Sequence, residues 1–126
     1  MKQYDKEVEK LYGNTETYQE YTEKTKSYID EKWDVVNVGM KKIFDDFYSC
    51  KSIGRLPSSN EAQGLVKKLQ AYITENYYTC TDKILSGLGK LYISDERFKK
   101  NINKSGNGTA EYVSEAIEEF CEQNAK

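Results

Sequence analysis

Residues 33–47 read WDVVNVGMKKIFDDF, and the spacing of their apolar side chains decides the fold class. These side chains recur every three or four positions, which places them on one face of an α-helix. The members of this stripe are Trp33, Val36, Met40, Ile43, Phe44 and Phe47. A stripe of this length predicts a long helix with one buried face.

Three further segments carry apolar stripes with the same helical spacing. Residues 84–92 are short and almost wholly apolar, and residues 113–120 give a C-terminal stripe. The second long stripe consists of Ala62, Leu65, Val66, Leu69 and Ile73. Gly54-Arg55-Leu56-Pro57 separates it from the first long helix, and Ser58 with Glu61 matches a capping box at its start. Because no alternating strand pattern is found, the sequence predicts an all-α fold.

The length of the chain predicts one domain, and its many charged residues nearly cancel in sign. The chain has 126 residues, and its 19 Lys and Arg against 21 Asp and Glu leave a formal charge of −2. This balance provides no broad cationic field, so neither nucleic acid nor a membrane surface is expected as a direct partner. No apolar run approaches the length of a membrane span, and Met1–Asp5 lacks the apolar core of a signal peptide. We therefore expect a soluble protein of the cytoplasm.

The residues that usually carry catalysis or bind metals are scarce. The chain has no His, which removes the commonest general base near neutral pH and the commonest nitrogen ligand for zinc. Its three cysteines, Cys50, Cys80 and Cys121, contain no Cys-x-x-Cys pair that could clip a metal. Cys80 precedes a predicted helix whose N-terminus could lower its pKa, but a buried, inert thiol is the favoured interpretation. The sequence thus predicts neither an enzyme nor a metal or cofactor site.

The first thirty residues are poor in large apolar side chains other than tyrosine. Tyr18, Tyr21 and Tyr28 have a spacing that places them on roughly one helix face. Their neighbours are polar, so the segment buries little area to offset an ordering entropy of about 1–2 kcal/mol per residue. Two interpretations remain open: a peripheral helix that packs its rings on the core, and a lid whose folding is coupled to ligand binding.

Residues 88–98 read LGKLYISDERF, which combines a helix, its end and the next cap in fixed spacing. With the motifs upstream of it, this stretch resembles the TipAS domain, the drug-binding half of a group of MerR-type transcriptional regulators. The resemblance runs from about residue 12 to the C-terminus. The upstream motifs are Tyr12-Gly13-Asn14-Thr15, Lys24-Thr25, Ser27-Tyr28, Trp33, Asn76, Tyr78 and Cys80.

The resemblance implies a globin-like helical arrangement with a deep cleft for macrocyclic thiopeptide antibiotics or other apolar heterocyclic drugs. In the family this domain senses the drug for a regulator of multidrug resistance whose separate N-terminal module binds DNA, or it occurs alone and sequesters the drug. We expect residues 1–30 to form marginally stable lid helices and residues 31–126 to form the drug-binding core, within one domain. Any homodimer is expected to form through the full-length protein.

Three positions depart from the family pattern and change the expected chemistry. Some members of the family trap their ligands through a Cys seven residues after the position of Cys80, where this chain has Gly87. Reversible, non-covalent binding is therefore expected. Leu85 and Tyr77 stand where relatives often carry His. The cleft should accordingly be more apolar, and its preferred ligand could differ from a thiopeptide.

The candidate ligand contacts are mainly aromatic, because rings suit a large, flat and poorly soluble ligand. Adjacent tyrosines at positions 77 and 78 cannot both face the core of one helix, so one should face outward or into a cavity. Gly87 is included because glycine permits close approach, and core packing is the competing interpretation for Trp33, Leu88 and Tyr92. The predicted ligand-binding residues are Tyr18, Tyr21, Trp33, Asn76, Tyr77, Tyr78, Cys80, Gly87, Leu88 and Tyr92.

Two functions of other classes remain open. The first is a helical protein–protein interaction or oligomerisation domain, whose apolar surface meets another chain and binds no small molecule. The second is an enzyme that uses Cys80 as nucleophile, which is disfavoured because the chain has no His to partner it.

Overall fold

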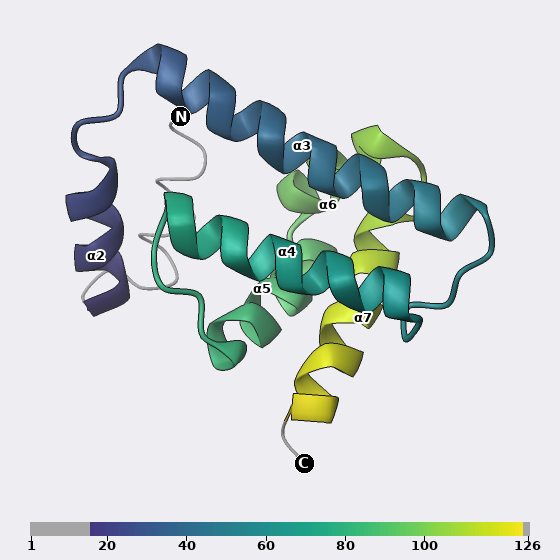
Figure 1. Ribbon diagram of the computed structural model, residues 1–126. Helices are drawn as coiled ribbons and strands as arrows, with labels where there is room; N and C mark the ends of the chain where they lie inside the picture. Colours follow the sequence, from purple (N-terminus) through teal and green to yellow (C-terminus); the bar gives the residue numbers. More distant parts are fainter. Residues whose placement is uncertain (1–15, 125–126) are drawn as a thin grey trace.

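The computed structural model describes residues 16–124, and in this range the chain forms α-helices and one short 3-10 turn but no strand (Figure 1). The all-α prediction is confirmed. Residues 1–15, which include half of the predicted lid segment and the Tyr12–Thr15 motif, lie outside the described residues. The elements are α2 (Glu16–Thr25), α3 (Asp30–Ser52), α4 (Asn60–Asn76), α5 (Asp82–Ser94), α6 (Glu96–Ile102), η1 (Asn103–Ser105) and α7 (Thr109–Asn124).

Helices α3 and α4 form an antiparallel pair in front of α5, α6 and α7 (Figure 1). The stripes found in the sequence are the faces they bury, with Ile43 and Phe47 on α3 and Leu69 on α4 almost fully removed from solvent. Between them Gly54 takes a φ of +86°, a left-handed conformation that glycine adopts without steric cost. The hydrophobic effect therefore places both stripes in one shared core.

The start of α4 corrects one detail of the sequence analysis. The capping residue is Ser59, whose hydroxyl accepts a hydrogen bond from the Ala62 N–H at 3.2 Å. The predicted capping box used Ser58, which has the right spacing to Glu61 but lies one residue too early. Glu61 instead pairs with Arg55 across the turn at 3.5 Å. Two serines in succession make such a register error easy in sequence reasoning.

The second layer is held together by the packing of α5 on α7. A side chain at Gly89 would place its Cβ 3.0 Å from the Ile117 side chain, so this glycine lets the two helices approach closely. Thr81 caps α5, and Asp95 caps α6 by accepting a hydrogen bond from the Arg97 N–H at 2.9 Å. The cap at Asp95 turns the chain sharply, so that α6 and η1 cover one end of the core. Among the described residues, no helix is both long and apolar enough to cross a bilayer.

Candidate functional site

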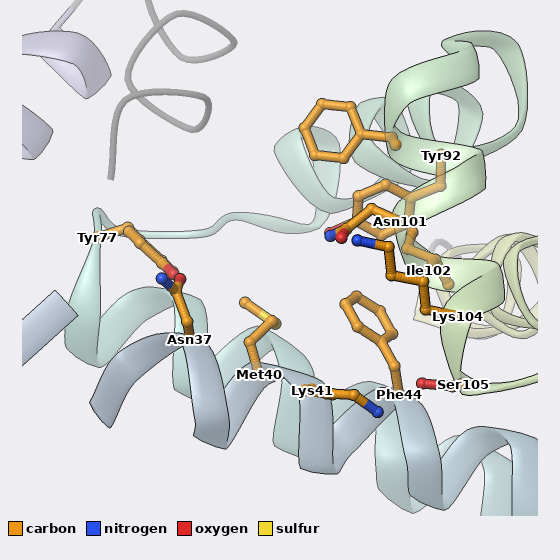
Figure 2. A pocket seen from close by; sticks show the side chains of 11 residues that line it. Asn37, Met40, Lys41, Phe44, Tyr77, Tyr92, Asn101, Ile102, Lys104 and Ser105 are labelled. Carbon is orange, nitrogen blue, oxygen red and sulfur yellow. The ribbon is translucent and has the colours of Figure 1, made fainter. Parts of the chain in front are cut away.

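A cavity of about 390 Å³ lies between α3 on one side and α6 with η1 on the other (Figure 2). Tyr92 of α5 and Tyr77, the residue that follows α4, complete its wall. Its volume falls in the range of about 300–1,000 Å³ that is usual for small-molecule sites. The lining residues are Asn37, Met40, Lys41, Phe44, Tyr77, Tyr92, Phe98, Asn101, Ile102, Lys104 and Ser105.

Three aromatic rings form much of the apolar wall. Phe44 meets Tyr92 edge to face, with ring centroids 5.9 Å apart, and Tyr92 meets Phe98 at 5.6 Å. All three are buried, and so is Ile102 beside them. Such pairs hold their geometry through the ring quadrupoles as well as through burial. The wall is therefore a fixed aromatic surface against which a flat ligand can stack.

Tyr77 closes the cavity at the C-terminal end of α4. The helix ends at Asn76, and Tyr77 leaves the helical conformation with φ −124° and ψ −61°. Tyr77 and Tyr78 are therefore both buried, at 2% and 0% exposure, because they no longer share one helix. Of the two, Tyr77 faces the cavity. Burial, with a smaller effect of nearby Tyr72, raises the pKa of its hydroxyl, which is a neutral donor near pH 7.

Tyr77 also belongs to an aromatic cluster that extends away from the cavity to α2. Its ring centroid lies 6.3 Å from that of Tyr21 on α2 and 6.0 Å from that of Trp33 on α3. Tyr21 in turn contacts Tyr18 and Tyr78, and Trp33 contacts Tyr28. We call Tyr18, Tyr21, Tyr28, Trp33, Tyr77 and Tyr78 the aromatic cluster. Through Tyr77, the packing of α2 is linked directly to one wall of the cavity.

Helix α2 is held on the C-terminal end of α4 chiefly by polar contacts. The Lys24 ammonium donates to the Thr74 carbonyl at 2.7 Å, and the Tyr28 hydroxyl donates to the Asn76 carbonyl at 2.9 Å. These carbonyls lie in the last turn of α4, where no helical N–H reaches them and where α4 has no basic residue of its own. Lys24 thus supplies from α2 the cation that a helix C-terminus favours.

A third contact joins α2 to the turn after α4. The Thr79 hydroxyl donates to the Glu20 carboxylate at 2.6 Å. Burial raises the pKa of Glu20, but the Thr79 hydrogen bonds and the charge of Lys24 outweigh it and leave the pKa below its ordinary value. A lowered pKa in the folded state means that this contact stabilises docking near neutral pH and is lost as the pH falls through that pKa.

Polar side chains form the mouth of the cavity. Lys41 pairs with Asp45 at 3.0 Å, and hydrogen bonds from Ser105 and then from Lys41 hold the pKa of Asp45 below its usual range. Asn37 projects from α3, and Asn101 and Lys104 come from α6 and η1 on the opposite side. Figure 2 shows Asn101 and Lys104 directing their polar ends over the Phe44 ring. The cavity thus has an apolar interior and a polar, basic rim.

The structure divides the ten predicted ligand-binding residues into three groups. Tyr77 and Tyr92 line the cavity. Tyr18, Tyr21, Trp33 and Tyr78 lie in the aromatic cluster beside it. The remaining four, which do not line the cavity, are Asn76, Cys80, Gly87 and Leu88.

These four residues have other surroundings. Asn76 ends α4 and donates to the Tyr72 carbonyl at 3.0 Å, and Leu88 is packed in the core. At Gly87 the expected close approach is absent among residues 16–124, because a Cβ there would meet no atom within 4 Å. Gly87 is instead an exposed position on α5, and the close approach on this helix occurs at Gly89.

Cys80 is buried, as the favoured interpretation predicted. Its side chain is 4% exposed, and burial, with a smaller effect of the nearby Asp82 carboxylate, raises its pKa to about 12. A thiol with such a pKa is almost entirely protonated near neutral pH and is a poor nucleophile. Its backbone N–H donates to the Thr74 hydroxyl at 3.1 Å, so this residue is a structural part of the turn.

The sequence analysis missed most of the cavity. Met40 and Phe44 were recognised only as parts of a core stripe, and Phe98 only as part of a motif. The polar rim carried no periodic signal, because exposed Asn and Lys are normal on any helix surface. The omitted lining residues are Asn37, Met40, Lys41, Phe44, Phe98, Asn101, Ile102, Lys104 and Ser105.

The fold and the cavity together define a compact helical domain with the attributes of a small-molecule binding module. Among the described residues, no group of three or more His, Cys, Asp or Glu side chains is arranged to hold a metal ion. The model of the TipAS antibiotic-recognition domain family matches residues 4–120. The chain belongs to this family, which confirms the resemblance found in its motifs.

Its relatives are transcriptional activators. Two relatives are the HTH-type transcriptional activators TipA of Streptomyces coelicolor and of Streptomyces lividans. Each is 33% identical to this chain over 115 residues, which is 91% of this chain and 46% of the relative. The HTH-type transcriptional activator mta of Bacillus subtilis is 34% identical over 119 residues, which is 94% of this chain and 45% of the relative. The chain therefore spans less than half the length of these curated relatives.

Two solved structures share the fold. A structure of TipAS of Streptomyces lividans in complex with the thiopeptide antibiotic nosiheptide aligns with a TM-score of 0.86 and 30% identity, over 99% of this chain and 87% of that one. The antibiotic-binding domain of a TipA-class multidrug resistance regulator aligns with a TM-score of 0.67 and 25% identity, over 72% of this chain and 97% of that one. These matches confirm the expected all-α, globin-like fold.

Proposed function

We propose that this chain is the antibiotic-binding domain of a TipA-type regulator and that its ligand occupies the cavity between α3 and α6. The observation that carries the proposal is the aromatic wall formed by Phe44, Tyr92 and Phe98 in a chain of the TipAS family. The solved relative of highest TM-score given above is a complex with nosiheptide, which supports a thiopeptide-like or other apolar heterocyclic drug as the ligand class.

The physical basis of binding is the removal of apolar area from water. Each Å² of apolar surface buried contributes about 25 cal/mol, and a ring packed on Phe44 adds about 0.5–1.5 kcal/mol. A cavity of about 390 Å³ admits several heterocycles but not a whole macrocycle. We expect one edge of a thiopeptide to enter the cavity while the rest of the ring lies across its mouth.

Binding should be reversible. The family's reactive Cys position is occupied by Gly87, and Cys80 is buried with its pKa raised to about 12. Burial, with a smaller effect of Asp82, also raises the pKa of nearby Cys121. A protonated, enclosed thiol cannot add readily to a dehydroamino acid, because the thiolate is the nucleophile. The drug should therefore leave the protein unchanged when it dissociates.

We further propose that residues 1–30 act as a lid over the core formed by residues 31–126. Within the described part, Tyr21 is the buried side chain of α2, Tyr18 is partly buried beside it, and Lys24 and Glu20 add polar contacts. A helix held by so few contacts opens at low free-energy cost. Because Tyr21 touches Tyr77, a ligand that fixes Tyr77 would also favour the docked position of α2.

The wider role follows from the relatives. A full-length regulator would join this domain to a DNA-binding module, and the drug-bound domain would alter how that module acts on its promoter. A stand-alone protein with the same cavity would instead sequester the drug. Both roles belong to a protein of the cytoplasm, and any homodimer would form through the full-length chain. Because this domain is nearly neutral, we expect another module, and not this domain, to contact DNA directly.

Nosiheptide should quench or shift the fluorescence of Trp33, the single tryptophan of the chain, with a stoichiometry of one drug per protein. Trp33 reports the site because its ring lies 6.0 Å from that of Tyr77. After denaturation the intact mass should equal that of the unmodified protein. A stable adduct that disappears in the Cys80→Ala variant would refute reversible binding, and unchanged fluorescence and calorimetry would refute thiopeptide binding.

Replacing Lys24 with Met should loosen α2 without unfolding the core. The change removes a charged hydrogen bond to Thr74, which is worth about 1.5 kcal/mol, so amide exchange in residues 16–25 should accelerate about tenfold. Lys26→Met is the matched control, because within residues 16–124 the partner of Lys26 is the exposed Glu23. Equal acceleration in the two variants, measured by hydrogen–deuterium exchange with mass spectrometry, would contradict the docking role of Lys24.

A further inference from the structure

The mouth of the cavity contains polar side chains that have no partner within the protein. In residues 16–124, no hydrogen bond or ion pair engages the side chains of Asn37, Asn101 or Lys104, although each lines the cavity. Asn101 and Lys104 direct their polar ends to the same part of the cavity (Figure 2). Their donors are therefore available to a bound molecule at no cost in protein contacts.

The charges at this mouth are positive. Lys41 and Lys104 line the cavity, and no Asp or Glu is among its lining residues. The carboxylate beside it, Asp45, already accepts from Lys41 at 3.0 Å and from Ser105. In the described part of the chain, no carboxylate lies within ion-pair distance of Lys104, so its charge is not compensated locally.

We propose that the ligand of this cavity is an aromatic molecule that carries an anionic group, a carboxylate or a sulfonate. The inference rests on the proposed function, and it narrows the ligand class of the same cavity. The rings pack against Met40 and Phe44, and the anion accepts hydrogen bonds from the Lys104 ammonium and the Asn101 amide. An apolar heterocycle without an anion uses only the first set of contacts.

Because Lys104 lies at the mouth of the cavity, the anionic group should raise the binding affinity by a modest amount. Its ammonium lies at the mouth of a cavity with a mainly apolar lining, where the local dielectric is lower than in bulk water. The residue is nevertheless exposed, so the pairing should contribute about 1 kcal/mol, equivalent to about fivefold in affinity. Salt should weaken this contribution, since the pair is near the surface.

Two fluorescent probes test the proposal because they share a ring system and differ in one charged group. Anilinonaphthalene sulfonate carries the anion, and N-phenylnaphthylamine lacks it. We expect the wild-type protein to prefer the sulfonate about fivefold relative to the neutral probe at low salt. Lys104→Met should remove most of this preference, because the loss of affinity should be larger for the sulfonate than for the neutral probe. Lys100→Met, which alters an exposed lysine outside the cavity, should keep the preference.

The outcomes separate this proposal from the proposed function. Equal affinity for both probes, or equal loss in the Lys104→Met and Lys100→Met variants, would overturn the anion preference while leaving a cavity that binds apolar rings. Failure of both probes to bind would overturn both proposals. Displacement of the sulfonate by nosiheptide places the two ligands at one site, and Asn101→Leu provides a second variant that should also reduce the preference.

Discussion

Replacing Met40 with Trp will weaken nosiheptide binding by about 10- to 100-fold while the domain stays folded. Met40 lies on the cavity wall in the middle of α3 and is only half-buried, so the larger side chain can fill the cavity without displacing the core (Figure 2). A buried indole gains about 1.5–3 kcal/mol from leaving water. A ligand that displaces it loses this amount of binding free energy, which calorimetric titration will measure.

Val38→Trp is the matched control for this variant. Val38 lies two residues earlier on the same helix, and 71% of its side chain is exposed on the face that points away from the core. The same indole at this position should change nosiheptide affinity less than about twofold, since it cannot enter the cavity. If Met40→Trp binds nosiheptide as tightly as Val38→Trp, the drug does not occupy the space between α3 and α6.

Truncating Tyr77 to Ala should be the most destabilising single change at the site. The ring is 2% exposed and contacts both Tyr21 and Trp33, so its removal leaves a cavity and breaks two aromatic pairs. Large-to-small changes of this kind cost about 3–5 kcal/mol, a large part of the stability of a small domain. Urea denaturation should show the loss, and hydrogen exchange should show residues 16–25 exposed first, because Tyr21 loses one of its ring contacts to the core.

The Tyr77→Phe variant measures the contribution of the hydroxyl to stability separately from that of the ring. This variant keeps the ring contacts with Tyr21 and Trp33, so it should lose much less stability than Tyr77→Ala, about 1 kcal/mol. If Tyr77→Ala were as stable as Tyr77→Phe, the ring would not be the link between α2 and the cavity wall. If α2 kept its protection in Tyr77→Ala, its remaining contacts, Tyr21 with Tyr78 and the polar contacts of Lys24 and Glu20, would be enough to hold it in place.

The helical fold could be predicted because burial follows a simple period. The residues at three- and four-residue spacing from Val36 to Phe47 are on the inner face of α3, and their partners on α4 meet them. The buried faces of these helices depend on local sequence and on the hydrophobic effect alone. The capping position at Ser59 was missed by one residue, because two consecutive serines offer the same hydroxyl and only the backbone conformation distinguishes them.

The cavity could be predicted only in part, because it arises between elements that are far apart in sequence. Tyr77 was identified from its unusual position next to Tyr78, although the reason is that α4 ends before it. Phe44 has the same helical spacing as its core neighbours, and nothing local distinguishes a ring that lines a cavity from one that fills the core. Lys104 acquires its place at the mouth from the short α6 and the η1 turn, whose packing is tertiary.

Leu85 and Gly87, two positions of α5 at which the sequence departs from the family pattern, do not line the cavity. Leu85 is fully buried in the core, so the His that relatives often carry at this position would need a buried partner here. Gly87 lies exposed on α5, away from the cavity lining. The absence of a thiol at position 87 is the basis of the prediction that binding is reversible.

The most direct test of drug binding in this cavity is a two-dimensional amide NMR titration of the labelled protein with nosiheptide. Binding between α3 and α6 predicts that the amides of Met40, Phe44, Tyr77 and Ile102 shift together and stop shifting at one drug per chain. An unchanged spectrum would contradict the account. So would shifts confined to the acidic groove near Leu56 on the α3–α4 turn and on α7, far from these residues.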